Sequence, residues 1–260
     1  MKHGLKAVAL FDIHTKTRPT DLAKCGWKPD VSDALWTALN FCDDFKPDIT
    51  ILGGDVVDLP EISRFTERQK ITREKLRLNH TFEFTNQILD RIDKFTQEEV
   101  VYEEGNHEAW LRMWIEENPA LEGLISLEKN LRLKERDYKV IPENKAYKLG
   151  KARFIHGWYV TLHHCKKTVN EMGDNVFYGH THDVQVHTKA NYEQKPIMGQ
   201  SMGCLCNLDP TWRKGRPNRW VHGFGIFYFS SDGAFTSYNP IIINGKFWWN
   251  GKLYTPTEGK

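Results

Sequence analysis

The stretch LKAVALFDIH, residues 5–14, decides the fold class, because an apolar run ends abruptly in an aspartate and a histidine. Residues 5–11 have the composition of a buried strand. The segment 31–45 repeats apolar positions at the spacing of an amphipathic helix, and residues 48–52 (DITIL) are a second short β-branched run. A strand, a helix and a strand in succession predict a partly parallel α/β sheet.

The rest of the chain keeps this pattern to about its middle and then becomes richer in strands. Helical segments are predicted over 60–97, with a looser charged piece at its start, and over 107–132, with an interruption near Pro119. A strand is predicted between them, over 98–102. A further helix is predicted over 159–172. Short strands are predicted at 138–141, 146–149, 152–155 and 174–178, and β alternation continues from 184 in VQVHTKA, GFGIFYFS, IIING and KFWWNGK. We therefore expect a single domain over 1–260, with a β-rich part over 184–260.

The composition excludes several classes of protein. Of the 260 residues, 40% are apolar and 27% are charged, which is typical of a folded rather than a disordered chain. The net charge of +2 does not by itself indicate nucleic-acid binding. No run reaches the ~18 apolar residues of a membrane helix, so we expect no membrane partner. The odd cysteine count predicts reduced thiols and a cytoplasmic location; the cysteines are Cys25, Cys42, Cys165, Cys204 and Cys206.

Polar side chains follow five of the predicted strands, at the point where each strand ends. In open α/β sheets, ligands gather outside the carboxyl ends of the strands, so we expect these side chains to meet at one rim. In chain order they are Asp12 and His14; Asp55 and Asp58; Asn106, His107 and Glu108; His156; and His180 and His182.

This mixture of side chains suits a site for two divalent ions. Carboxylate, carboxamide and imidazole groups bind borderline ions such as Mn²⁺, Fe²⁺ and Zn²⁺. An aspartate has two oxygens and can bridge two ions ~3.5–4 Å apart. Residues i and i+2 of extended backbone point the same way, so D-x-H and H-T-H can each deliver two ligands. Glycines at 54, 105, 157 and 179 allow sharp bends where the ligands converge.

Each residue also has an ordinary interpretation. Asp12, Asp55 and Asn106 could cap the helices that follow their strands. His156 could be an unremarkable strand-end residue, and the H-T-H pair could be a polar turn. His163 and His164 belong to no motif, and we expect them to be surface or groove residues. The metal interpretation is favoured because all five strand ends carry such groups together.

The motifs D-x-H, G-D-x-x-D, G-N-H-[DE], H-G and G-H-T-H, in this order over residues 12–182, resemble those of the calcineurin-like metallophosphoesterases. That superfamily includes protein phosphatases, cyclic-nucleotide phosphodiesterases and double-strand-break repair nucleases. The resemblance implies an α/β fold, a four-layer α-β-β-α sandwich of two mixed sheets flanked by helices. One departure is that Thr15-Lys16-Thr17 follows the first motif, where many members have a glycine.

The resemblance also implies a role for each site residue. One ion would bind Asp12, His14, Asp55 and His182, and the other would bind Asp55, Asn106, His156 and His180, with Asp55 as the bridge. Manganese is the expected ion, and iron, zinc, nickel and magnesium are alternatives. His107 would face the substrate rather than a metal.

The expected chemistry follows from these charges. Two cations lower the pKa of a shared water toward neutrality and offset charge on phosphoryl oxygens. His107 is the candidate that protonates the leaving group. Asp58 and Glu108 are placed to orient ligand histidines.

Two basic segments bear on the substrate. Residues 61–78 are rich in arginine and lysine, which could contact phosphates of a substrate. The alternative is that they form the solvent-exposed face of a helix. In residues 211–220 (TWRKGRPNRW), basic side chains lie between two tryptophans. The cations could contact phosphates, and the indoles could stack on bases. The alternative is an ordinary turn whose tryptophans are structural. These cations are Arg213, Lys214, Arg216 and Arg219.

We therefore predict a hydrolase of phosphoric esters, a phosphodiesterase or nuclease acting on DNA or RNA. One alternative is a phosphomonoesterase or a small-molecule or cyclic-nucleotide phosphodiesterase. A second alternative is a non-catalytic scaffold with the same fold, which predicts missing ligands, whereas all seven are present.

Overall fold

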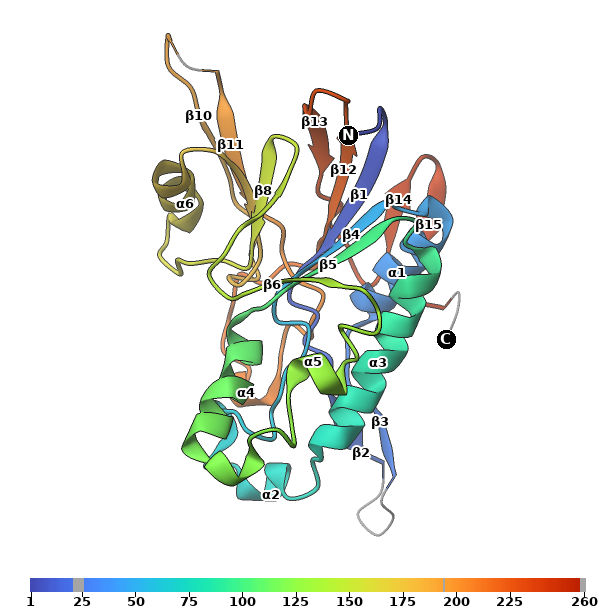
Figure 1. The fold of residues 1–260 in the computed structure, drawn as a ribbon, viewed down its shortest axis with the longest axis vertical. Helices are drawn as coiled ribbons and strands as arrows, with labels where there is room; N and C mark the ends of the chain where they lie inside the picture. Colours follow the sequence, from blue (N-terminus) through green and yellow to red (C-terminus); the bar gives the residue numbers. More distant parts are fainter. Residues whose placement is uncertain (21–25, 194, 258–260) are drawn as a thin grey trace.

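The structure, a computed structural model, describes residues 1–20, 26–193 and 195–257 (Figure 1). Within these residues the framework is a six-stranded sheet, a five-stranded sheet and two two-stranded ribbons. The strands are β1 (Leu5–Leu10), β2 (Thr17–Pro19), β3 (Trp27–Pro29), β4 (Ile49–Gly53), β5 (Glu99–Glu103), β6 (Lys139–Ile141), β7 (Tyr147–Leu149), β8 (Ala152–Ile155), β9 (Asn175–Tyr178), β10 (Val186–Lys189), β11 (Ile197–Ser201), β12 (Gly225–Phe229), β13 (Phe235–Tyr238), β14 (Phe247–Trp249) and β15 (Lys252–Tyr254). The helices are α1 (Asp33–Phe45), α2 (Lys70–Arg73), α3 (Leu78–Phe95), α4 (Asn106–Glu117), α5 (Leu127–Asn130) and α6 (His164–Met172), with 3-10 turns η1 (Arg64–Thr66), η2 (Pro119–Leu121) and η3 (Thr211–Arg213).

The six-stranded sheet has the order β13-β12-β1-β4-β5-β6. Strands β1, β4, β5 and β6 are parallel, whereas β12 runs antiparallel to β1 and β13 antiparallel to β12. The registers Leu10↔Leu52 and Gly53↔Glu103 bring the carboxyl ends of β1, β4 and β5 to the same edge. The β–α–β unit predicted from the first 52 residues is therefore confirmed by β1, α1 and β4.

The five-stranded sheet has the order β10-β11-β9-β8-β7 and is also mixed. Strands β8, β9 and β11 are parallel, with β7 and β10 antiparallel at the two edges. Strand β8 leads into His156, and β9 leads into the H-T-H motif. This sheet therefore supplies three predicted ligands, His156, His180 and His182, whereas the other four follow strands of the six-stranded sheet.

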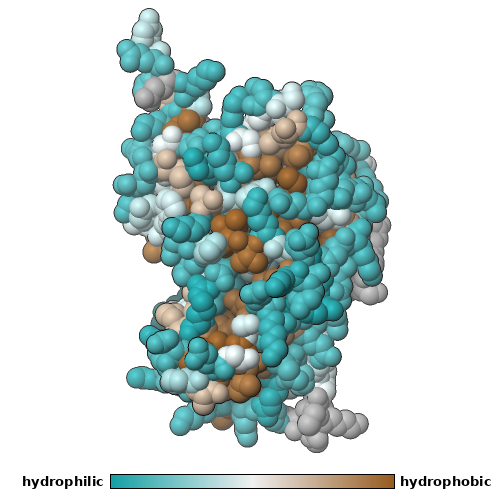
Figure 2. Space-filling view, viewed as in Figure 1, coloured by the Kyte–Doolittle hydropathy of each residue, from teal (hydrophilic) through white to brown (hydrophobic). Residues whose placement is uncertain are grey.

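The two sheets pack face to face through aromatic side chains. Phe227 of β12 lies with its ring centroid 5.0 Å from that of Phe154 and 4.8 Å from that of Phe177, on β8 and β9. Helices α1 and α3 cover the other face of the six-stranded sheet through residues such as Leu35 and Ile88. Helix α6 packs on the far side of the five-stranded sheet, so the predicted α-β-β-α sandwich is confirmed. The face seen in Figure 2 is mostly hydrophilic, with apolar patches that run down its middle.

Some predicted elements differ from the structure, and one strand was missed. The helix predicted over 159–172 begins only at His164, because Tyr159, Val160 and Thr161 have low helix propensity and lie in a loop. In the segment 60–97, the looser start contains only η1 and α2, and the long helix α3 begins at Leu78. In the segment 107–132, η2 interrupts the helical run at Pro119, between α4 and α5, as predicted. The strand predicted for IIING at 241–245 forms only isolated bridges, whereas β11 was missed because Gly199 and Gln200 weaken its pattern. None of the helices in the described ranges is both long enough and apolar enough to span a membrane.

Candidate metal centre

Five of the seven predicted ligands have a left-handed backbone conformation. The φ angle is +50° at Asp12, +49° at His14, +49° at Asp55, +65° at His180 and +59° at His182. Positive φ is uncommon for residues other than glycine, costs of order 1–3 kcal/mol, and clusters at functional sites. The prediction that D-x-H and H-T-H lie on extended backbone is therefore wrong. Both pairs are delivered by left-handed turns, which also bring alternate side chains together.

Asp55 lies at the centre of the site. Its Oδ2 atom is 3.7 Å from Nε2 of His14 and 3.4 Å from Nε2 of His156. His14 follows β1 in the six-stranded sheet, and His156 follows β8 in the five-stranded sheet. One carboxylate oxygen therefore stands between imidazoles that come from the two sheets, which is the position a bridging ligand requires.

The other predicted ligands lie on the two sides of Asp55. On the side of His14, Nε2 of His182 is 3.0 Å from Asp12 Oδ1 and 3.3 Å from Nε2 of His14. On the side of His156, Nε2 of that residue is 3.0 Å from Oδ1 of Asn106. His180 completes this side, because its ring nitrogen, the ring nitrogen of His156 and a carboxylate oxygen of Asp55 lie within 4.8 Å of one another.

The hydrogen bonds of the histidines show that these groups fit metal ions. Nδ1 of His14 contacts Asp58 Oδ1 at 3.0 Å, and Nδ1 of His156 contacts the carbonyl oxygen of Gly53 at 3.0 Å. Both oxygens are acceptors, so each Nδ1 donates its proton and each Nε2 of a neutral ring presents a lone pair. These lone pairs face oxygens of Asp55 and Asn106, an arrangement that is unfavourable unless a proton or a cation lies between them. Donors ~2.1 Å from one ion stand ~3.0–3.5 Å apart. The separations of 3.0–3.4 Å around His156 and His182 lie in this range, and the 3.7 Å between His14 Nε2 and Asp55 Oδ2 is slightly longer.

The pKa shifts show that protons compete for these positions. Burial alone would lower the pKa of His156, but the Asp55 carboxylate, Asp12 and the Gly53 carbonyl together outweigh burial and raise this pKa to about 10. Burial also opposes protonation of His182, whereas Cys206 and Asp12 favour it, and its pKa is raised to about 9. A divalent ion would take the place of these protons, so metal binding releases protons.

Two glycines allow the carboxylates to approach the backbone. A Cβ at Gly105 would lie 2.2 Å from Asp55 Oδ1, and a Cβ at Gly179 would lie 2.1 Å from Asp12 Oδ2. The space is used by hydrogen bonds from backbone amides, because His107 N donates to Asp55 Oδ1 (2.9 Å) and His180 N donates to Asp12 Oδ2 (2.7 Å). Any larger residue at either glycine would displace a predicted ligand.

His107 lies beside the candidate metal centre and faces Asp55. Its Nδ1 donates to the carbonyl oxygen of Asp58 at 2.7 Å, and its Nε2 is 3.7 Å from Asp55 Oδ2. The ring packs against Trp110, with centroids 3.7 Å apart. Burial lowers the pKa of His107 below its ordinary value, so the neutral ring predominates near neutral pH, with its Nε2 unprotonated.

Asp58 orients histidines, whereas Glu108 acts on the backbone. Asp58 Oδ1 accepts from His14, and Asp58 Oδ2 accepts from Lys16 at 2.8 Å, which gives a role to a residue in the Thr15-Lys16-Thr17 departure. Among the described residues, the Glu108 carboxylate accepts hydrogen bonds from the amides of Asp55, Val56, Val57 and Gly105 and from the Tyr102 hydroxyl. The prediction that Glu108 orients a ligand histidine is therefore wrong: it fixes the loop that carries Asp55.

The basic segment 211–220 lies against one side of the site. The Trp220 ring is 4.3 Å from the ring of His182. Arg213 does not point to the site: its Nη2 donates to the carbonyl oxygens of Arg216 and Pro217 at 3.0 and 2.9 Å, so it holds its own loop. Arg219 Nη2 is 3.9 Å from Asp183 Oδ2, and Lys214 and Arg216 are exposed. In the other basic segment, residues 61–78, Arg73 donates to the carbonyl oxygen of Glu61, so at least this cation bonds within its own segment.

Three contacts near the site have no signal in the sequence. Sγ of Cys206 is 3.6 Å from Nδ1 of His182, so this thiol lies beside a predicted ligand. His164 was expected at the surface or in a groove, but it is 1% exposed, and its Nδ1 is 2.7 Å from the Tyr178 hydroxyl. Nε2 of His164 is 2.9 Å from Oδ1 of Asp183, the residue after the H-T-H motif. His163 is exposed, as predicted. Cys42, Cys165, Cys204 and Cys206 are free thiols, and Cys25 lies outside the described residues.

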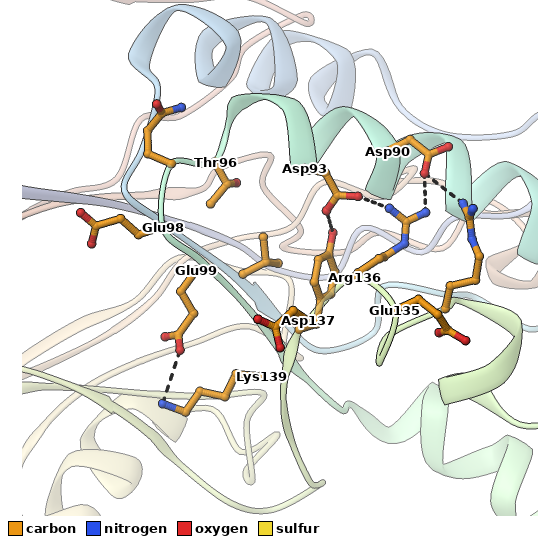
Figure 3. Close-up of a pocket in the computed structure, with 13 residues that line it drawn as sticks. Asp90, Asp93, Thr96, Glu98, Glu99, Glu135, Arg136, Asp137 and Lys139 are labelled. Atoms are coloured by element: carbon orange, nitrogen blue, oxygen red, sulfur yellow. Dashed lines mark hydrogen bonds and ion pairs between the residues drawn. The ribbon is translucent and has the colours of Figure 1, made fainter.

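Two cavities differ in their relation to the site. A cavity of about 270 Å³ adjoins it and is lined by Asn106, Glu143, Asn144, His156, Gly157, Trp158 and His180. A larger one, about 670 Å³, lies around the amino end of β5 and is lined by residues of both charges (Figure 3). There Arg136 is held between Asp90 and Asp93, and none of the predicted ligands lines the cavity. The smaller cavity is therefore the one relevant to a substrate.

Comparison with known proteins gives little further information. No protein-family model and no curated protein matches this chain. Among solved structures, Vps29 of Chaetomium thermophilum is similar at 9% identity with a TM-score of 0.38, over 97% of this chain and 99% of that one. TT1561 of Thermus thermophilus is similar at 11% identity with a TM-score of 0.35, over 91% of this chain and 99% of that one. The function must therefore be inferred from the site itself.

Proposed function

We propose that this protein is a metal-dependent phosphoesterase, and specifically a phosphodiesterase or nuclease that acts on nucleic acid. The observation that supports it best is the position of Asp55 Oδ2, between His14 and His156 and within 3.7 Å of both Nε2 atoms. A structural zinc site would need a single closed set of ligands, whereas the donors here are divided between two sides of one shared carboxylate.

The chain would hold two divalent ions with the residues already described. Asp12, His14 and His182 would hold one ion, Asn106, His156 and His180 would hold the other, and Asp55 would contribute to both. When bound, the ions would activate water and offset negative charge on the phosphoryl oxygens. Oxygen and imidazole donors together accept several divalent ions, and we propose manganese, with iron, zinc, nickel or magnesium as alternatives.

His107 would manage the proton of the leaving group. Its Nδ1–H is fixed by the Asp58 carbonyl, so only Nε2 can exchange a proton with a substrate. The ring must therefore carry a second proton to act as an acid. Its packing against Trp110 and its contact with Asp58 hold Nε2 on the side of Asp55.

A nucleic-acid substrate is favoured by the surroundings of the site. Lys214 and Arg216 are exposed on a loop whose Trp220 touches His182, so phosphates beyond the scissile one would meet positive charge. The cavity of about 270 Å³ beside His156 favours the second candidate, a small phosphomonoester or cyclic nucleotide, because it would enclose a compact group. The scaffold alternative predicts missing ligands, whereas the described structure contains all seven.

Hydrolysis of two chromogenic esters tests the proposal. With Mn²⁺ present, bis-p-nitrophenyl phosphate should be hydrolysed with a higher kcat/KM than p-nitrophenyl phosphate. A strong preference for the monoester would remove the nuclease proposal and favour the second candidate. No hydrolysis of either ester, in protein shown to contain metal, would favour the scaffold.

A further inference from the structure

The loop of residues 211–220, here the aromatic–basic loop, is fixed to the rim of the candidate metal centre. Val221 N, immediately after the loop, donates to the carbonyl oxygen of His182 at 2.8 Å. The Trp220 ring meets the His182 ring edge-on at 4.3 Å. Asn218 Nδ2 donates to the carbonyl oxygen of Leu208, which closes the loop at its base. The loop therefore has a defined position relative to the predicted ligands.

Arg213 makes the loop rigid from within. Its guanidinium carbon lies 4.8 Å from the centroid of Trp220 and 5.6 Å from that of Trp212, and its Nη2 donates to two backbone carbonyl oxygens of the loop. Cation–π contacts and hydrogen bonds together limit the movement of both indoles. Trp212 is thus held in place rather than displayed on a flexible segment.

Trp212 nevertheless remains 46% exposed. An indole is large and apolar, so leaving it in water forgoes stabilisation that burial would provide. Lys214 and Arg216, also exposed, follow it within four residues. An aromatic platform beside two cations matches a strand of unpaired nucleotides, in which bases offer flat faces and phosphates offer negative charge.

We propose that the aromatic–basic loop binds an unpaired nucleic-acid strand, with a base stacked on Trp212 and phosphates against Lys214 and Arg216. This inference rests on the proposed function and adds that the nucleic-acid substrate is single-stranded where it meets the loop. The His182–Trp220 and Trp220–Trp212 centroid separations are 4.3 and 6.0 Å, so Trp212 is at most about 10 Å from the His182 ring. At ~3.4 Å per stacked nucleotide, that span is roughly three nucleotides from the site. A duplex hides its base faces and could not stack there.

Binding of a labelled oligothymidylate to the whole protein, with metals removed by EDTA so that cleavage is absent, tests this directly. Trp212→Ala should weaken binding roughly 5- to 150-fold, the range for loss of one stacked base. Trp212→Phe should retain most of the affinity, because an aromatic face remains. Trp248→Ala is the matched control, since Trp248 is 68% exposed on the separate β14–β15 ribbon, and should bind within about twofold of wild type.

The charged residues provide a second readout. Lys214→Ala with Arg216→Ala should reduce the slope of log affinity against log salt concentration by about 1.4, which corresponds to two single-strand phosphate contacts. The proposal is overturned if Trp212→Ala binds like the Trp248→Ala control, or if the oligothymidylate in a duplex with its complement binds as tightly as it does alone.

These outcomes are separate from those of the proposed function. If wild type binds the oligothymidylate through Trp212 but does not cleave it when Mn²⁺ is restored, the binding site stands and the nuclease proposal fails. If wild type cleaves the strand while Trp212→Ala matches the control in binding, the nuclease proposal stands and the binding site is wrong.

Discussion

A single oxygen atom, Oδ2 of Asp55, joins the two halves of the candidate metal centre. Asp55→Asn replaces one carboxylate oxygen with an amide nitrogen that cannot coordinate an ion. We expect it to lose affinity for both ions and to lower hydrolysis of bis-p-nitrophenyl phosphate by more than about 10²-fold, since losses of that size already follow changes outside the ligand set. Metal content and steady-state rate measure the effect.

A matched control for this prediction is Asp48→Asn. Asp48 is also a buried aspartate, but it pairs with Lys2 at the amino end of β4. It should keep both metal content and activity. If Asp55→Asn retained its metals and rate, Asp55 would not be a bridging ligand.

His107 is the second residue whose role can be measured alone. Its backbone N–H donates to Asp55 Oδ1 and its Nδ1 donates to the carbonyl oxygen of Asp58, and it is not one of the seven predicted ligands. His107→Ala should therefore keep the metals, and should slow esters with poor leaving groups more than those with good ones, by up to about 10²–10⁴-fold. Because burial lowers the pKa of His107, its contribution as an acid should grow as the pH falls. An equal loss for all leaving groups would mean that His107 does not transfer the proton.

At the residue scale, the sequence predicts ligand identities better than their surroundings. Asp12, Asp55 and His182 could be selected because they follow predicted strands in recognisable motifs. Cys206 and Trp220 could not, because each touches His182 only after folding brings distant segments together. The burial of His164 likewise depends on where α6 packs, which no local pattern specifies.

Among the elements, the turns after the strands determine the site more than the strands themselves. The carboxyl-end rule correctly places the side chains at one rim, but it does not predict the left-handed turns at Asp12, His14 and Asp55. Those conformations depend on contacts with other elements, such as the Glu108 carboxylate of α4 that accepts from the amides of Asp55 and Val56. Local propensity disfavours the turns, so sequence patterns cannot reveal them.

The turn after β9 offers a prediction at this scale. Gly179→Ala would place a Cβ 2.1 Å from Asp12 Oδ2, so the carboxylate must move and lose its hydrogen bond from His180 N. We expect weaker metal binding, measured by titration with Mn²⁺, in a protein that still folds. Gly123→Ala is the control: its φ is +74° and no atom lies within 4 Å of the added Cβ, so it should cost roughly 1 kcal/mol of stability and leave metal affinity unchanged. Equal metal affinity in the two variants would show that the close approach at Gly179 is unimportant.

The whole molecule is a sandwich whose sheets face each other across an apolar core. Glu103 is a carboxylic acid buried in this otherwise apolar region. It follows Val101 on the same face of β5, is 2% exposed, and burial raises its pKa to about 8. The unfolded chain loses this proton near pH 4.5, whereas the folded protein keeps it until about pH 8. Between these pH values only the folded protein keeps the proton, so the free energy of unfolding decreases progressively as the pH rises from 4.5 to 8.

Glu103→Gln should remove this dependence, because its amide cannot ionise. With metals chelated in both proteins, the variant should be no more stable than wild type at pH 4.5 and should gain relative to it as the pH rises, by roughly 5 kcal/mol at most at pH 8. Denaturant unfolding at a series of pH values measures the difference. A constant difference between pH 4.5 and 8 would show that Glu103 does not titrate in this range.

The most direct measurement is anomalous scattering from crystals of the protein grown with Mn²⁺. We predict two peaks ~3.5–4 Å apart, one on each side of Asp55 Oδ2. Asp12, His14 and His182 should coordinate one ion, and Asn106, His156 and His180 the other. Peaks that do not touch Asp55, or the absence of any peak among these seven side chains at saturating Mn²⁺, would contradict the two-metal centre.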